Sequence, residues 1–170
     1  MRVYLATPEI FHRDWPTFSA AAAHISAKLG LELVLPVPGD VPLHGHGVTQ
    51  PGSLTLAATI FHACLDKVDS VDAVVADFNP FRGAEPDSGV VVEATYAYAQ
   101  GIPVIGFTNG IPAPRETARA RLAESGAWVD GRHYVVEDFG LPCNLMPYHV
   151  CADFTFDGVG DALARVARGR

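Results

Sequence analysis

The chain has 170 residues, of which 49 % are hydrophobic, so it is long enough to bury one core as a single domain over residues 1–170. Its 19 acidic and 12 basic residues give a net charge of −7, which argues against a general nucleic-acid-binding surface. The sequence has no apolar run of about 20 residues that would span a membrane, and its start, MRVYLATPEIF, is unlike a signal peptide. Three cysteines without a CxxC pair are typical of a reduced, cytoplasmic protein.

Apolar runs and helical patterns alternate along the chain. Helix ends are marked by glycine and helix starts by Ser or Asp. In chain order we expect a strand at 3–6, a helix at 14–29 ended by Gly30, a strand at 31–35, a helix at 53–67 capped by Ser53, a strand at 71–78, a helix at 88–100 ended by Gly101, a strand at 102–107, a polar helix at 114–125, an edge strand at 134–136 and a helix at 157–168 capped by Asp157.

This alternation predicts an α/β fold with a parallel sheet. The runs DAVVADF and IPVIGF are almost continuously apolar, as expected of strands that are covered on both faces. We therefore expect a flavodoxin-like, doubly wound parallel sheet of five strands with helices on both faces. In the strand order 2-1-3-4-5, ligands bind where the order reverses, which places the site after Ala6 and after Val75.

Two segments carry no regular pattern. Residues 36–52 are rich in Pro and Gly, and such a long connection is either a binding loop or a surface excursion. Residues 79–86, NPFRGAEP, link the third strand to its helix.

Three carboxylates stand close together in the sequence around that second segment. Asp77 ends a buried strand, Asp87 precedes a helix, and Glu93 lies inside that helix among valines and alanines. A carboxylate in such surroundings is partly desolvated, which costs free energy unless it is compensated. Asp87 can equally be an ordinary N-cap. Converging carboxylates suit glycosidic-bond chemistry, in which one traps the cationic sugar centre and another protonates the leaving group.

Three motifs in this order resemble the nucleoside 2-deoxyribosyltransferase family over most of the chain. VYLATPEIF resembles the family's Y-L-A-G-P-x-x-F start, and DAVVADFNPFRGAEPDSGVVVEATYAYAQGIPVIGFTN resembles its central signature, an Asp-x-Gly with a Glu four residues after the Gly. VEDFGLPCNLMPY matches its Asn-Leu-Met motif. The resemblance implies a flavodoxin-like fold and transfer of 2-deoxyribose between nucleobases, in nucleotide salvage, without metal or organic cofactor.

The resemblance also implies roles for individual residues. Glu93 takes the position of the nucleophile, which forms a covalent deoxyribosyl-enzyme, so that two inversions retain the configuration. Tyr4 orients Glu93, and Asp77 is the candidate acid that exchanges a proton with the base. The residues expected to bind the nucleoside are Asp87, which binds the sugar hydroxyls, Gly89 beside it, Phe11, which with Phe81 is a candidate to stack on the base, and Asn144 and Met146, which enter a neighbouring subunit's site in a homo-oligomer.

The chain departs from the family pattern at several places. Val90 and Val91 replace the usual Thr-Ala, and Thr7 replaces the Gly of Y-L-A-G-P; we expect all three to border the pocket. Cys64 lies where some relatives carry a base-binding Asp, a place that Asp66 could also reach.

Two other functions are possible for a chain with these features. An N-glycoside hydrolase acting on nucleosides or their 5′-monophosphates could use the same Glu93 intermediate with water as the acceptor. The chain could also be a flavodoxin-like signalling or flavin-binding module. It lacks the lysine after the last strand that a signalling module would need and the phosphate loop that flavin binding would need. His44, His46 and His149 lack a metal-ligand spacing, so no metal site is expected.

Overall fold

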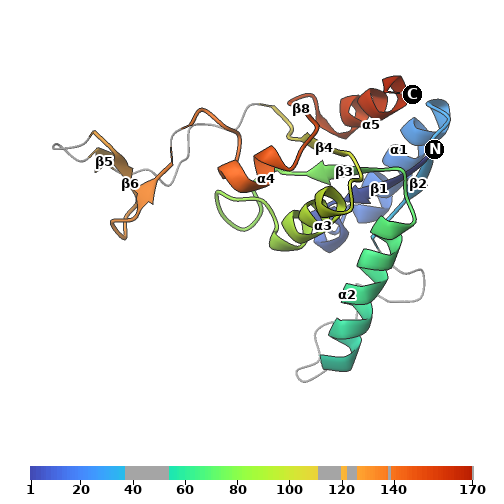
Figure 1. Cartoon of the computed structure of the whole chain (residues 1–170), viewed down its shortest axis with the longest axis horizontal. Coiled ribbons are helices and arrows are strands. Elements are labelled where there is room, and N and C mark those ends of the chain that lie inside the picture. Colours follow the sequence, from blue (N-terminus) through green and yellow to red (C-terminus); the bar gives the residue numbers. More distant parts are fainter. Residues whose placement is uncertain (37–53, 111–119, 122–125, 138, 170) are drawn as a thin grey trace.

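The computed structural model describes residues 1–36, 54–110, 120–121, 126–137 and 139–169. A five-stranded parallel sheet with the order β2-β1-β3-β4-β8 forms the centre of the molecule (Figure 1). Its strands are β1 (Arg2–Ala6), β2 (Glu32–Val34), β3 (Ala73–Asp77), β4 (Val104–Phe107) and β8 (Asp153–Thr155). The predicted flavodoxin-like α/β fold is confirmed, with the strand order reversing between β1 and β3.

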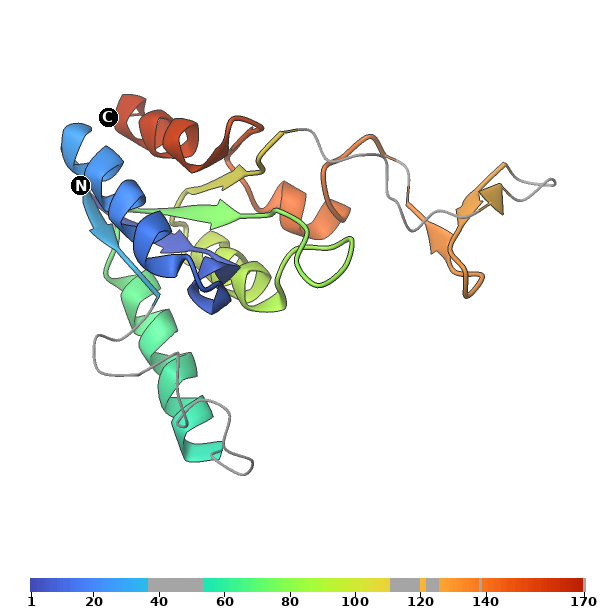
Figure 2. The same cartoon turned by 180° about the vertical axis from the view of Figure 1, so that it is seen from behind.

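Helices cover both faces of this sheet (Figures 1 and 2). On one face lie α1 (Trp15–Lys28) and α5 (Gly158–Arg168), and on the other α2 (Leu54–Asp69), α3 (Ser88–Ala99) and the short α4 (Leu145–His149). A 3-10 helix, η1 (Pro8–Phe11), follows β1. The helices α1 and α3 are followed by Gly30 and Gly101, whose backbones have φ values of 68° and 74° that favour glycine. None of the helices in the described part of the chain has the length and apolar character needed to cross a membrane.

Successive side chains of the buried strands point to opposite faces of the sheet, which divides the core into two halves. In β1, Val3 and Leu5 point toward α1 and α5, whereas Tyr4 and Ala6 point toward α2 and α3. The same alternation in β3 sends Val75 to the first half and Val74 to the second. Tyr4 is therefore fully buried on the face that α3 covers.

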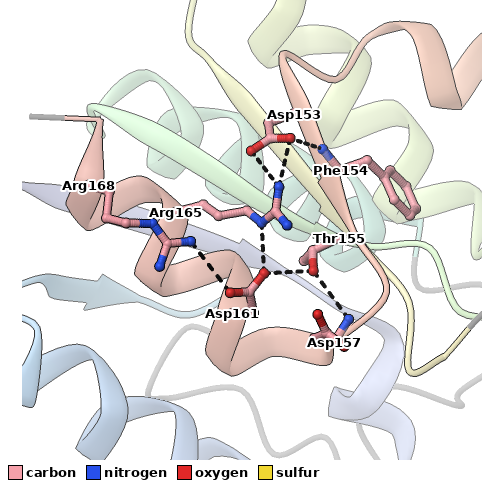
Figure 3. A network of polar contacts seen from close by, with 7 residues as sticks. All are labelled: Asp153, Phe154, Thr155, Asp157, Asp161, Arg165 and Arg168. Carbon is pink, nitrogen blue, oxygen red and sulfur yellow. Dashed lines mark hydrogen bonds and ion pairs between the residues drawn. The ribbon is translucent and has the colours of Figure 1, made fainter.

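A polar network fastens α5 to β8 at the edge of the sheet (Figure 3). The Nη1 atom of Arg165 lies 2.9 Å from both carboxylate oxygens of Asp153, and its Nε lies 2.7 Å from Oδ2 of Asp161. The hydroxyl of Thr155 donates to the same Asp161 oxygen at 2.7 Å. The side-chain donors of Arg165 and Thr155 all meet carboxylate oxygens, which makes this network a structural clamp.

The second half of the chain differs from the sequence-based expectation. The fifth strand of the main sheet is β8, which was not predicted, because three residues with polar ends carry too little pattern. Residues 120–121 form a strand, β5 (Ala120–Arg121), so a continuous helix over 114–125 is wrong. That strand pairs with β6 (Trp128–Val129) and β7 (Val135–Val136) in a separate antiparallel sheet that lies away from the main one, so 134–136 is not an edge of the main sheet (Figure 1). Ser53 and the rest of 114–125 lie outside the described residues.

Candidate active site

The carboxyl ends of β1 and β3 and the first turns of α3 meet at one edge of the sheet, as the strand order predicts. Tyr4 reaches Glu93 across the β1–α3 interface, and its hydroxyl donates a 2.9 Å hydrogen bond to Glu93 Oε1. These two residues are 89 positions apart in sequence. The predicted pairing of Tyr4 with Glu93 is thus present in the geometry.

Burial decides the protonation properties of this pair. Desolvation raises the pKa of Glu93 above its ordinary value, the hydrogen bonds from Tyr4 and Cys64 oppose that rise, and the charge of Asp87 adds to it. Desolvation and the adjacent Glu93 raise the pKa of Tyr4 as well, so its phenol stays a neutral donor. Glu93 itself is only half-buried, so a ligand can still reach its carboxylate.

Lys67 and Cys64, three residues apart on α2, complete the surroundings of Glu93. The Lys67 ammonium donates to the carbonyl oxygens of Leu35 at 2.9 Å and Pro36 at 3.0 Å, and its positive charge lowers the pKa of Glu93. Burial and the charge of Glu93 raise the pKa of the Cys64 thiol to about 11, which keeps it protonated. Sequence reasoning missed Lys67, although its spacing from Cys64 on one helix face was a usable signal. Asp66 is exposed.

A pocket of about 300 Å³ opens between α2 and α3 beside Glu93. It is lined by Phe61, Cys64 and Leu65 of α2 and by Ser88, Gly89, Val92 and Glu93 of α3. Val92 is the valine that lines it. The expectation that Val90, Val91 and Thr7 border the pocket is wrong, because none of the three lines it and Val90 is 2 % exposed in the core. The pocket gives a ligand one carboxylate, that of Glu93, against a mostly apolar wall.

Asp77 is the last residue of β3 and is 2 % exposed. Its Oδ2 accepts a 2.9 Å hydrogen bond from Thr7, and its Oδ1 accepts from the backbone N of Asn79 at 3.1 Å and from Asn79 Nδ2 at 2.6 Å. Desolvation raises the pKa of Asp77, and these three bonds hold part of the rise back. Thr7 therefore lies against Asp77.

Asp87 is the N-cap of α3, where its Oδ1 accepts from the backbone N of Gly89 at 2.9 Å and of Val90 at 3.2 Å. Its Oδ2 makes no hydrogen bond to the described part of the chain. Both interpretations of Asp87 are therefore compatible, because one oxygen caps the helix and the other remains for a ligand.

The aromatic residues expected near the base lie together. The rings of Phe11 and Phe81 stack with their centroids 6.1 Å apart, and the guanidinium carbon of Arg82 lies 4.6 Å from the Phe81 centroid and 5.7 Å from that of Phe11. Phe11 is 50 % exposed, so one edge of the cluster faces outward.

Asn144 and Met146 lie at the start of α4. Asn144 accepts from the backbone N of Met146 at 2.9 Å, and its Nδ2 donates to Glu137 at 2.7 Å. Its backbone N donates to Glu85 at 3.2 Å. Met146 is 69 % exposed. No hydrogen bond of the described residues joins either of them to Glu93 of their own chain.

Within the described ranges no cluster of His, Cys, Asp and Glu has the form of a metal site. His44 and His46 lie outside those ranges.

Comparison with known proteins agrees with this fold. The family model described as nucleoside 2-deoxyribosyltransferase matches residues 3–146. A 2-deoxyribosyltransferase from Leishmania mexicana superimposes with a TM-score of 0.73 at 25 % identity, over 98 % of this chain and 97 % of that one. A conserved protein from Enterococcus faecalis V583 shares the fold with a TM-score of 0.59 at 19 % identity, over 100 % and 99 % of the two chains. Among curated proteins none matches significantly. The chain belongs to the nucleoside 2-deoxyribosyltransferase family of glycosyl-transferring enzymes.

Proposed function

We propose that this enzyme exchanges the nucleobase of 2′-deoxynucleosides by a retaining double displacement through a deoxyribosyl ester on Glu93. The observation that carries the proposal is the 2.9 Å bond from Tyr4 to Glu93 Oε1, made at the wall of an apolar pocket. A partly desolvated carboxylate is a stronger nucleophile than a hydrated one, and a bond to one oxygen fixes the direction of the other.

In the first half-reaction a Glu93 oxygen bonds to the anomeric carbon as the glycosidic C–N bond breaks. The bonding electron pair leaves with the base, and Asp77 supplies the proton that neutralises it. Because the pKa of Asp77 is raised by burial, a protonated fraction is available closer to neutral pH than for an ordinary Asp. The second half-reaction is the reverse with a new base, which returns the proton to Asp77 and frees Glu93.

We propose that Asp87, Gly89 and Phe11 bind the nucleoside. The free Oδ2 of Asp87 is placed to accept from the sugar hydroxyls, next to Gly89, which lacks a side chain and lines the pocket. The exposed edge of Phe11 offers a stacking surface to the base. We propose no cofactor or metal for these steps.

The enzyme works as a homo-oligomer in this proposal, with Asn144 and Met146 entering the neighbouring subunit's site. Met146 projects from α4 with 69 % of its surface exposed, and Leu54 and Phe61 on α2 are also largely exposed apolar side chains. Mixing Asn144→Ala and Glu93→Gln subunits tests this arrangement. If sites are shared, the mixed oligomers regain activity that neither variant has alone, whereas full activity of an Asn144→Ala monomer contradicts it.

Incubation with deoxyinosine and adenine tests the reaction itself, with products followed by chromatography. Formation of deoxyadenosine and hypoxanthine is expected. Release of free base without deoxyadenosine would instead identify an N-glycoside hydrolase, and no change at all would indicate a binding module. The three cysteines are free thiols, which suits the reducing cytoplasm that we propose as the enzyme's location in nucleotide salvage.

A further inference from the structure

Thr7, the residue directly after β1, is 3 % exposed and lies against the end of β3. Its hydroxyl oxygen accepts the backbone N–H of Glu9 at 3.2 Å and lies 2.9 Å from Asp77 Oδ2. Because Glu9 supplies a hydrogen to this oxygen, the hydroxyl's own hydrogen is the one that points at the Asp77 carboxylate. Thr7 is thus a directed donor to an ionised Asp77.

The other oxygen of Asp77 is held from a different side. Asn79 donates to Oδ1 through its backbone N and through its side chain, and Asn79 Oδ1 accepts from the backbone N of Asn109 at 2.8 Å. Asn109 follows β4, so the network joins the ends of β1, β3 and β4. Within it, the hydrogen bond from Thr7 is the one made to Oδ2.

We propose that Thr7 is a positioning residue that sets the proton affinity of Asp77 during base exchange. The inference rests on the proposed function, in which Asp77 gives a proton to the leaving base and takes one from the incoming base. A hydroxyl that donates to the carboxylate favours the ionised form and so limits how tightly Asp77 holds its proton. The glycine found at this place in the Y-L-A-G-P motif has no such donor.

The neighbours of Asp77 define the direction in which its pKa should change when Thr7 is replaced. Desolvation raises its pKa, the negative charge of Glu9 on η1 raises it further, and the bonds from Asn79 and Thr7 lower it. Replacing Thr7 by Val keeps the shape and removes the hydroxyl. The pKa of Asp77 then rises, and the fall in kcat/KM that accompanies its deprotonation moves to higher pH.

The pH dependence of kcat/KM for deoxyinosine, with adenine as acceptor, measures this effect. For Thr7→Val we expect the alkaline limb to move up by about one pH unit, the size expected for losing one hydrogen bond to a charged group. Thr7→Ser restores the hydroxyl and should return the limb to its wild-type position. An unmoved limb in Thr7→Val overturns the proposal.

Thr155 provides a matched control. Its buried hydroxyl also accepts a backbone N–H, from Asp157 at 3.2 Å, and donates to a carboxylate, Asp161, at 2.7 Å (Figure 3). Thr155→Val therefore removes the same kind of bond from the α5 edge and should lower stability without moving the pH limb. If both variants move the limb equally, the effect is a general loss of stability and the proposal fails.

A titration of the Asp77 carboxyl carbon by NMR separates this inference from the proposed function. With ¹³C-labelled aspartate, and with Asp77→Asn to assign the signal, Asp77 should titrate about one pH unit higher in Thr7→Val than in the wild type. Equal titration in both proteins overturns the role of Thr7, whatever the enzyme's activity. Full base exchange by Asp77→Asn would instead overturn the role of Asp77 in the reaction.

Discussion

Two polar networks, each with a carboxylate at its centre, differ in what surrounds that carboxylate. At the α5 edge, Asp161 accepts from Arg165 and Thr155, and these bonds lower its pKa to about 2. In α3, Glu93 accepts a hydrogen bond from Tyr4 at 2.9 Å, and desolvation raises the pKa of Glu93 instead. A carboxylate opposite an arginine at a wet surface is stabilised as a fixed charge. One beside a phenol in an apolar pocket is desolvated, which suits the nucleophile role that we propose for Glu93.

The largest difference between the networks should appear when each carboxylate is made neutral. We expect Glu93→Gln to lower base exchange at least about a thousand-fold, because no other group replaces the nucleophile. Its thermal stability should equal or exceed that of the wild type, since an amide costs less to bury than a carboxylate. Chromatographic rates and a melting curve measure both.

Asp161→Asn is the control for this prediction. It should keep near-wild-type activity and lose stability, which is the opposite pattern. If Glu93→Gln retained more than about a tenth of the wild-type rate, Glu93 would not be the nucleophile.

Removing only the donor to Glu93 should have a smaller effect. We expect Tyr4→Phe to lower kcat/KM about ten- to a hundred-fold, the value of one hydrogen bond to a charged group. The bond from Tyr4 lowers the pKa of Glu93, so its loss raises that pKa. Because the reaction needs ionised Glu93, the acidic limb of the pH profile should move to higher pH. A limb that stays in place would show that Tyr4 only fills space.

Replacing Lys67 should further distinguish the two networks, because Lys67 is the cation near Glu93. Lys67→Met removes a charge that lowers the pKa of Glu93. The acidic limb should again move upward, by less than in Tyr4→Phe, since the ammonium acts through space and is shared with the carbonyls of Leu35 and Pro36. Lys67→Arg should keep most of the wild-type profile. The exposed Lys28, the chain's other lysine, gives a charge-matched control in Lys28→Met, which should leave the limb unchanged.

The smallest expected change lies in the α5 network. Arg165→Ala should cost about 1 kcal/mol of folding stability, because this ion pair is partly exposed, and leave activity unchanged. The folded-state pKa of Asp161 lies below its ordinary 3.8, so its contribution is present above that pH and is lost as pH falls toward about 2. In Arg165→Ala that acid-induced loss should shrink, as urea unfolding at a series of pH values would measure. A large loss of activity would contradict the division between the two networks.

Much of the first half of the molecule could be predicted from the sequence. Buried strands rich in valine and helices ended by Gly30 and Gly101 carry strong local patterns, which the structure confirms. The strand β8 could not be found, because its three residues are stabilised by pairing with β4 and by the Arg165 network rather than by local preference. At 120–121, pairing of β5 with β6 replaces the expected helix.

The candidate site divides in the same way. The resemblance placed Tyr4 and Glu93, and alternation along β1 explains why Tyr4 faces α3. The anchoring of Lys67 at the end of β2 and the bond from Thr7 to Asp77 span 31 or more positions in sequence. No local motif predicts such contacts, because they depend on which strand ends lie side by side.

Trapping the glycosyl-enzyme tests the central claim most directly. A 2′-fluoro arabinosyl nucleoside slows both formation and breakdown of a sugar ester, because its electronegative substituent disfavours the oxocarbenium-like transition state. Without an acceptor base, intact-protein mass spectrometry should then reveal one added glycosyl group, and peptide mapping should place it on Glu93 in the wild type and nowhere in Glu93→Gln. Base release without any adduct, or an adduct on another residue, would contradict Glu93 as the nucleophile.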